Sequence, residues 1–307
     1  METYVVKSIN FENRLKSRSG GFFFEVATKI INNGGIVYGC VLDDNLQVKH
    51  IRGTSLEEIK LMQGSKYVQS VIGNSYLLCK KDLDNGEKVL FSGTPCQIAG
   101  LKSFLNKDYE NLFTIDIVCH GVSSQKVFHD YINYLEEKYK KKVINFNFRN
   151  KEKYGWDSNY ETIYFDDDTS IDSQIYQNLY YSYIFFRKSC FDCKFKNLNR
   201  VSDITIADAW SDKFDVDFDD NNGISLILIN TNSGRKLLNY VQKCFEIKDV
   251  NIKDYLQSPF KEQLHKDDKK IRKFQKVYNR NKFSKFLKKY YLNHYKEIFI
   301  KKLKRGK

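Results

Sequence analysis

The sequence predicts an α/β fold with α+β elements, in which a mixed sheet with a parallel βαβ core is followed by a basic helical tail. The apolar run Lys88–Phe91 is followed by a turn, by a helical pattern that begins at Pro95, and by a second apolar run, Leu112–Val118. This order is typical of a βαβ unit with parallel strands. Further short apolar runs flank the unit. From residue 261 the chain turns basic and amphipathic.

The segment before this unit predicts one helix, a hairpin and a second, short helix. Apolar residues recur at helical spacing over Phe22–Asn33. Ile36–Leu42 and Leu46–Arg52 flank a polar turn and predict the two strands of a hairpin. Ser55 and Glu58 have the spacing of a capping box, which opens the short helix.

The segment after the unit alternates between helical and strand patterns. Acidic residues 166–168 predict a turn in an antiparallel part of the fold. The expected elements are a helix from Ser124 to about Lys140, strands Val143–Arg149 and Glu161–Phe165, an aromatic-rich helix Gln174–Lys188, strands Asp203–Ile206 and Ile224–Asn230, and a helix from Ser233 to about Phe245.

Composition bounds the class of protein. The chain has 307 residues, of which 41% are hydrophobic, enough to bury a core. No apolar run reaches the roughly 20 residues that a bilayer crossing needs. The N-terminal residues show neither the apolar stretch nor the cleavage site of a secretory signal, so a cytoplasmic location is expected. Seven cysteines in a reducing compartment predict thiols or ligands rather than disulfides.

Charge is concentrated at one end of the chain. Residues 261–307 contain 18 Lys and Arg against 4 Asp and Glu, a net charge of +14, which leaves a net −1 for residues 1–260. This pattern predicts a main domain over 1–260 and an appended basic amphipathic tail over 261–307, and argues against a nucleic-acid partner. The tail helix is expected either to contact an anionic membrane surface or to pack on its own domain; its apolar residues are Phe283, Phe286, Leu287, Tyr290, Tyr295, Ile298, Phe299 and Leu303.

Four cysteines lie where ligands are expected. Cys96 and Cys119 each follow a predicted parallel strand, at the sheet edge where α/β proteins bind ligands. Cys190 and Cys193 have the C-x-x-C spacing that chelates a metal, but no second close pair completes a zinc knuckle. Cys96 and Cys119 are therefore the candidates for the remaining two ligands.

The residues alone leave alternatives open. Cys40, Cys79 and Cys244 lie in apolar patterns and are expected to be small buried side chains. A redox dithiol of Cys190 and Cys193 is a second interpretation, and a nucleophilic Cys96 with His120 as its base is a third. A zinc site that serves only structure is a fourth.

Several stretches in this order resemble the coenzyme F420 hydrogenase/dehydrogenase beta-subunit family, and in particular bacterial members linked with surface-polysaccharide clusters. The resemblance covers roughly Ser17 to Tyr240. The stretches are SRSGGFFFEVA, NNGGIVYGCVLD, GSKYVQS, VLFSGTPCQIAGLK, IDIVCHGVSS, RKSCFDCKFKNLNRVSDITIADAW and NGISLILINT.

The resemblance implies a flavin iron–sulfur oxidoreductase. Such a protein passes electrons between a hydride carrier, FAD and a [4Fe–4S] cluster; the carrier is the deazaflavin coenzyme F420 in the archaeal enzymes, or a nicotinamide. The resemblance also identifies the cluster ligands as Cys96, Cys119, Cys190 and Cys193. The competing class is a non-redox thiol or zinc enzyme, or a scaffold, in glycan assembly. No catalytic residue is identified.

Within this resemblance, three motifs suit a flavin. Ser19, Gly20 and Gly21 precede a helix and can offer backbone N–H groups to a phosphate, although the glycines also suit a plain turn. Thr94 and Pro95 can line the ring system of the flavin. The third motif is formed by Gly64, Ser65, Lys66 and Tyr67, and it places a hydroxyl, a cation and an aromatic ring close together. The plainer interpretation is that Lys66 is a solvated lysine.

Two departures from the family pattern affect the expected function. Relatives commonly begin with a ferredoxin-like segment of two four-cysteine runs, but no cysteine here precedes Cys40. The electrons are therefore expected to pass to a separate ferredoxin-like or redox-enzyme partner, which docks on a positive face formed by Lys188, Lys194, Lys196 and Arg200. Alanines flank Asp208 where the family has glycine and an aromatic residue, which changes the expected cofactor packing there.

Overall fold

The computed structural model describes residues 2–211, 218–261 and 268–292. The strands are β1 (Glu2–Ser8), β2 (Ile36–Leu42), β3 (Val48–Gly53), β4 (Val89–Gly93), β5 (Leu112–Ile117), β6 (Val143–Asn147), β7 (Glu161–Phe165), β8 (Ser170–Ser173), β9 (Ile204–Asp208), β10 (Ser225–Ile229) and β11 (Phe245–Asp249). The helices are α1 (Phe11–Lys16), α2 (Phe22–Ile31), α3 (Leu56–Met62), α4 (Ser75–Asp84), α5 (Pro95–Leu105), α6 (Gln125–Tyr139), α7 (Lys151–Tyr154), α8 (Ile175–Tyr181), α9 (Lys188–Phe191), α10 (Asn232–Val241), α11 (Ser258–Lys261) and α12 (Asp268–Arg280), with 3₁₀ helices η1 (Gln242–Cys244) and η2 (Ile252–Tyr255).

The main sheet has eight strands in the order β11-β1-β10-β9-β5-β4-β2-β3. Its centre is parallel, because β2 pairs with β4, β4 with β5, and β5 with β9 in the same direction. The outer pairs are antiparallel. The β4-α5-β5 unit is the predicted βαβ core, so the predicted mixed α/β sheet is confirmed.

The alternation of side chains along each central strand fills two cores. On β4, Val89 and Phe91 face α4 and α5, whereas Leu90 faces α2 and α10 on the opposite side. Two helices begin at the local signals that predicted them: Pro95 is the first residue of α5, and the Ser55–Glu58 capping box lies at the start of α3.

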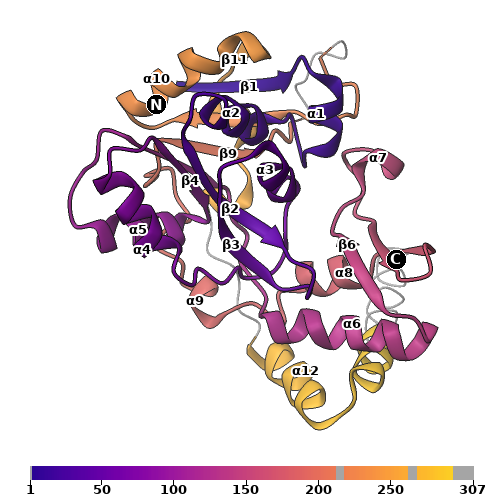
Figure 1. Ribbon diagram of the computed structural model, residues 1–307. Helices are drawn as coiled ribbons and strands as arrows, with labels where there is room; N and C mark the ends of the chain where they lie inside the picture. Colours follow the sequence, from indigo (N-terminus) through magenta and orange to yellow (C-terminus); the bar gives the residue numbers. More distant parts are fainter. Residues whose placement is uncertain (1, 212–217, 262–267, 293–307) are drawn as a thin grey trace.

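A second unit lies beside the main sheet, formed by the antiparallel sheet β6-β7-β8 with α6 and α8 (Figure 1). Its core is rich in aromatic rings, with Phe128 at the centre; the ring centroids of Phe146 and Phe148 each lie 5.1 Å from that of Phe128. The turn at residues 166–168 joins β7 to β8, a strand that the sequence pattern did not reveal.

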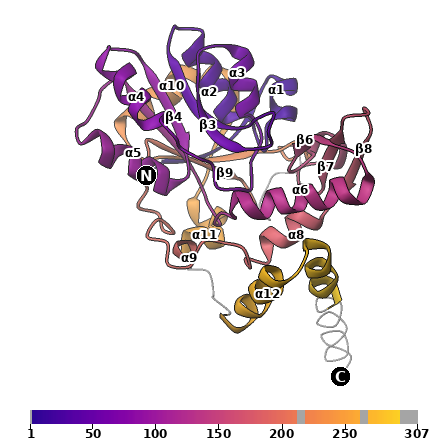
Figure 2. The same ribbon diagram turned by 60° about the horizontal axis from the view of Figure 1, so that its bottom comes forward.

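Part of the predicted tail packs on this second unit. Helix α12 and the helical residues 283–292 lie against α6 and α8 (Figure 2). The buried residues Phe274, Phe283, Phe286, Leu287 and Tyr290 join the aromatic core, so these side chains are not open to a membrane. The other predicted apolar positions (295, 298, 299 and 303) lie outside the described residues, and the domain boundary after residue 260 stays a prediction.

Three predicted boundaries were wrong. The helix predicted over Gln174–Lys188 ends at Tyr181, where the chain turns through Tyr183 at φ 61°. The cap of α10 is Thr231 rather than Ser233, because the Thr231 hydroxyl accepts from the Gly234 amide at 3.1 Å. That helix stops at Val241, where η1 follows, and Phe245 begins β11, which pairs with β1.

Two further observations concern the described residues. No described helix combines the length and apolar character that a membrane span requires. All seven cysteines fall within the described ranges, and none of them forms a disulfide there.

Candidate functional site

A cavity of about 350 Å³ opens at the carboxyl ends of the parallel strands. Thr94 follows β4, Val118 follows β5 and Trp210 follows β9, and all three residues line this cavity. The first turn of α2 and residues 62–70 complete the wall. The position agrees with the rule that open α/β sheets bind ligands at this edge.

The fold gathers the four predicted cluster ligands from distant parts of the chain. Cys96 lies in the first turn of α5, Cys119 lies just past β5, and Cys190 lies in α9; these three line the cavity. Burial raises the pKa of Cys119 to about 12, and the nearby thiols of Cys96, Cys190 and Cys193 act in the same direction. The thiols of Cys96, Cys190 and Cys193 are therefore all within electrostatic reach of Cys119.

The described part of the chain holds no group of three or more His, Cys, Asp or Glu side chains close enough to bind a single metal ion. A four-iron cluster spaces its thiolates more widely than one ion does. The backbone also acts on two of the thiols, because the Gly121 amide lowers the pKa of Cys119 and the Val122 amide lowers that of Cys190, which opposes the rise that burial causes.

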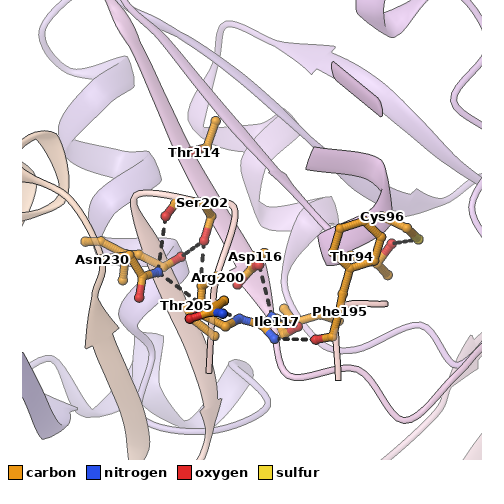
Figure 3. Close-up of polar contacts among 12 residues, drawn as sticks. Thr94, Cys96, Thr114, Asp116, Ile117, Phe195, Arg200, Ser202, Thr205 and Asn230 are labelled. Atoms are coloured by element: carbon orange, nitrogen blue, oxygen red, sulfur yellow. Dashed lines mark hydrogen bonds and ion pairs between the residues drawn. The ribbon is translucent and has the colours of Figure 1, made fainter. Parts of the chain in front are cut away.

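Arg200 ties two of the cysteine segments together (Figure 3). Its guanidinium donates to the Asp116 carboxylate on β5 at 3.0 Å and to the carbonyl of Phe195 at 2.9 Å. Asp116 lies shortly before Cys119, and Phe195 lies shortly after Cys193. The Arg200 side chain is only 2% exposed. It is therefore an internal brace, and its predicted role as a surface charge is wrong.

Two polar side chains lie close to these cysteines: Lys196 is buried, and His120 is half-buried. The Lys196 ammonium and His120 Nδ1 have no hydrogen-bond partner in the described residues. Burial lowers the pKa of Lys196, whereas the thiols of Cys193, Cys119 and Cys190 act to raise it. Lys196 is 7% exposed, so it too contributes no surface charge to the predicted docking face, where Lys188 and Lys194 remain exposed.

The residues of the Ser19-Gly20-Gly21 turn differ in whether they line the cavity. Gly21 is the residue before α2, has φ 88°, and lines the cavity with Ser19. Gly20 does not line it: its amide already donates to the Ser225 hydroxyl at 2.9 Å, and its carbonyl accepts from the Ser8 amide. Gly20 therefore serves close packing between strands, which replaces its predicted phosphate contact.

Residues Gly64, Ser65, Lys66 and Tyr67 all line the cavity as a continuous segment. The Lys66 ammonium donates to the carbonyls of Leu61 at 2.9 Å and Gln63 at 2.7 Å, and burial lowers its pKa to about 8. The Tyr67 ring packs edge-on against Tyr180, with centroids 4.8 Å apart.

Of the two residues predicted to face the ring system, only Thr94 lines the cavity. Its hydroxyl lies 3.2 Å from the Cys96 sulfur. Pro95 is buried in the first turn of α5, away from the cavity surface.

The cavity wall is cationic. Among the described residues, Arg18, Lys66, Arg149 and Arg187 line it, and the one described carboxylate in the lining is that of Asp208. No sequence pattern singled out Arg18, although it sits inside the SRSGG motif. Arg18 donates to Asp208 at 3.0 Å, but its buried Nε has no partner in the described residues. Such a wall favours an anionic ligand.

His50 is a further lining residue that no local signal identifies. Its Nε2 donates to the Ser92 carbonyl at 2.9 Å, which leaves Nδ1 to accept from the Ser70 hydroxyl at 2.9 Å. Burial lowers the pKa of His50 to about 4, so the ring is neutral near pH 7.

Comparison with known proteins adds independent findings. Residues 86–254, more than half of the chain, match the family described as the C-terminal part of the coenzyme F420 hydrogenase/dehydrogenase beta subunit. The chain is similar in fold to a chain of the xenon-derivatised F420-reducing [NiFe] hydrogenase complex from Methanosarcina barkeri, with a TM-score of 0.55 and 17% identity over 94% of this chain and 90% of that one. No curated protein matches.

Proposed function

The chain belongs to the coenzyme F420 hydrogenase/dehydrogenase beta-subunit family, and from this premise we propose that it is an oxidoreductase that binds FAD and one [4Fe–4S] cluster. In this role it passes electrons between a hydride carrier and an iron–sulfur partner. The carrier is coenzyme F420 or a nicotinamide, and the bacterial relatives that it resembles suggest a setting in surface-polysaccharide synthesis.

One observation carries the proposal. A single cavity joins the open first turn of α2 and residues 64–67 to the thiols of Cys96, Cys119 and Cys190. A flavin must accept two electrons as a hydride and release them singly, so it needs an electron acceptor close by. A cavity with a cationic wall in one part and thiols in another suits the binding of an anionic flavin cofactor next to an electron acceptor.

The residues present fit an anionic dinucleotide. Helix α2 is ten residues long, and no side chain in the described part of the chain caps its first turn, so its backbone N–H groups are open to a phosphate. The partnerless Nε of Arg18 offers a further buried donor beside this turn. We assign the diphosphate to this part of the wall, with Ser19 and Gly21, and the ring system to the part lined by Lys66, Tyr67 and Thr94.

The cysteine region fits an iron–sulfur cluster. Cys96 lies on α5, Cys190 on α9, Cys119 just after β5 and Cys193 just after α9. Backbone amides stabilise the charged form of two of these thiols, and the buried ammonium of Lys196, which has no hydrogen-bond partner in the described residues, interacts with three of them. Amide donors and buried cations are the features that stabilise a negatively charged cluster. We assign Cys96, Cys119, Cys190 and Cys193 as its ligands.

When bound, the flavin and cluster supply the hydride acceptance and single-electron transfer. The protein's own residues supply position and charge. Lys66, held by two carbonyls, keeps a cation against the cavity; Tyr67 and Tyr180 close one wall with aromatic rings; and Arg200 holds the segments that carry Cys119 and Cys193 in register. Neutral His50, fixed by Ser92, keeps its basic Nδ1 on Ser70.

The cluster assignment is tested by serine substitution. After anaerobic reconstitution, Cys96→Ser, Cys119→Ser, Cys190→Ser and Cys193→Ser are each expected to lose iron and the broad visible absorption. Cys244→Ser is the matched control, because this thiol lies at the end of η1, does not line the cavity, and should leave both unchanged when it is replaced. Stoichiometric zinc without iron in the parent protein would overturn the proposal in favour of a zinc enzyme or scaffold.

The flavin assignment has a separate readout. Arg18→Gln should weaken retention of FAD during gel filtration while iron content stays unchanged, because it removes a buried donor that is remote from the thiols in sequence. Lys66→Ala should act in the same direction. If the parent protein binds no flavin under anaerobic conditions, the hydride-transfer role is wrong even where iron is present.

A redox partner is proposed to dock beside α9. The exposed Lys188 and Lys194 flank Cys190 and Cys193, and suit an acidic ferredoxin-like surface. Reversing both charges should slow reduction of an added ferredoxin and weaken the dependence of its rate on salt, with flavin and iron unchanged. An unaltered rate would exclude this face.

A further inference from the structure

Lys196 differs from the other deeply buried cations of the protein. Lys151 is also buried, but its ammonium donates to the carbonyls of Arg14, Ser19 and Asn222 at 2.6, 2.9 and 2.7 Å. Buried Arg200 pairs with Asp116. The ammonium of Lys196 has no hydrogen-bond acceptor in the described part of the chain, although the residue is only 7% exposed. An unpaired buried charge opposes folding, so its presence needs an explanation.

The surroundings of Lys196 point to a negative group that it would face. Its amide bonds the carbonyl of Cys193 at 3.4 Å, so the side chain starts one turn beyond the C-x-x-C pair. The groups that act on its charge are the thiols of Cys193, Cys119 and Cys190, which come from two separate segments. The same charge reaches His120, which is half-buried and directly follows Cys119.

We propose that Lys196 is the internal counter-cation of the four-cysteine site, where it stabilises the reduced, more negative state of the bound cluster. This inference rests on the proposed function. One-electron reduction adds one negative charge without forming or breaking a bond, so a fixed cation nearby favours the reduced state. Lys196 is thus a positioning and tuning residue that sets how readily the site accepts an electron from the flavin.

The proposal predicts opposite effects of one substitution in two states. Lys196→Met keeps most of the side-chain volume and removes the charge. In the metal-free protein it should leave the melting temperature equal or higher, because an unpaired buried charge is removed. In the iron-loaded protein it should speed loss of iron to a chelator and lower the midpoint potential. The expected shift corresponds to about a tenfold lower ratio of reduced to oxidised cluster at a fixed potential.

Two companion variants make the experiment specific. Lys196→Arg keeps a cation and should retain a potential near that of the parent protein. Lys194→Met removes an exposed charge two residues away, which water screens, and should change neither the potential nor iron retention.

The outcomes separate the inference from its premise. If the parent protein takes up no iron, the proposed function fails and this inference fails with it. If the parent protein loads iron but Lys196→Met has an unchanged potential, the counter-cation role alone is wrong. Equal destabilisation of the metal-free and loaded variants would also overturn it, because a side chain that only fills space would act alike in both states.

Discussion

Replacing Arg200 with methionine should destabilise the protein more than the loss of any exposed ion pair. The Arg200 side chain is 2% exposed and that of Asp116 is 0% exposed, so neither charge is compensated by water. Arg200 also donates to the carbonyl of Phe195 and the hydroxyl of Thr205 (Figure 3). A further acceptor is the carbonyl of Asn197. Asp116 already has one carboxylate oxygen without a partner in the described residues.

The expected loss follows from this burial. Removing one partner of a buried ion pair costs about 3–5 kcal/mol, because the remaining charge stays desolvated. A domain of ordinary stability has a free energy of unfolding of about 5–15 kcal/mol, so the variant should remain folded but lose a large share of this free energy. Burial also raises the pKa of Asp116, and Arg200 opposes that rise. Without Arg200 the carboxyl should bind a proton more readily, so the deficit should be smaller at pH 5 than at pH 8.

Urea unfolding at both pH values measures these free energies. The matched control is Arg235→Met, which breaks the exposed pair with Glu2 and should cost less than about 1 kcal/mol. The double variant Asp116→Leu with Arg200→Met should recover much of the loss, because no charge is left buried. If Arg200→Met costs no more than the control, the pair is not the internal brace inferred here.

Three further predictions use other parts of the fold. The pKa of His50 is about 4 in the folded protein against an ordinary 6.5, so the unfolded state binds the proton first as the pH falls. The free energy of unfolding should therefore fall by up to about 3 kcal/mol between pH 6.5 and 4. In urea titrations His50→Asn should not show this fall, and the same pH dependence in the variant and the parent protein would contradict the prediction. Gly20→Ala places a Cβ 2.2 Å from a β1 carbonyl oxygen and should greatly lower the melting temperature, whereas Gly64→Ala meets open space and should cost only the about 1–2 kcal/mol of its positive φ. Fully buried Phe286→Ala should cost about 3–5 kcal/mol in urea unfolding, against less than about 0.5 kcal/mol for exposed Leu292→Ala; similar losses would mean that the tail does not share the core.

The elements that sequence reasoning predicted well are those with local signals. Pro95 at the start of α5 and the Ser55–Glu58 capping box act within one helical turn, and apolar alternation identifies β4 and β5 without any knowledge of their partners. The strands that it missed, β1, β8 and β11, are defined by pairing instead. β1, for example, lies between β10 and β11, more than 200 residues away along the chain.

The burial of charged side chains could not be predicted from the sequence either. Lys196 and Arg200 lie in a basic stretch that predicts an exposed surface, yet one is enclosed near the thiols and the other is paired with Asp116. The amide of Gly20 was expected to be free, but Ser225, some 200 residues away in sequence, accepts its hydrogen bond. Such contacts arise when separate segments pack, and no periodicity within one segment encodes them.

The sequence by itself determined that Cys96 and Cys119 share one edge of the sheet. A short strand, a helix and a second strand can connect in parallel in only one common arrangement, and both cysteines follow those strands directly. Only the tertiary structure decided what surrounds them. The turn at Tyr183 that brings α9 and Cys190 to this edge depends on packing of Tyr180, Phe186 and Ile271, the last from the tail helix. Because those contacts join residues from distant parts of the chain, the composition of the site emerges only when the whole core closes.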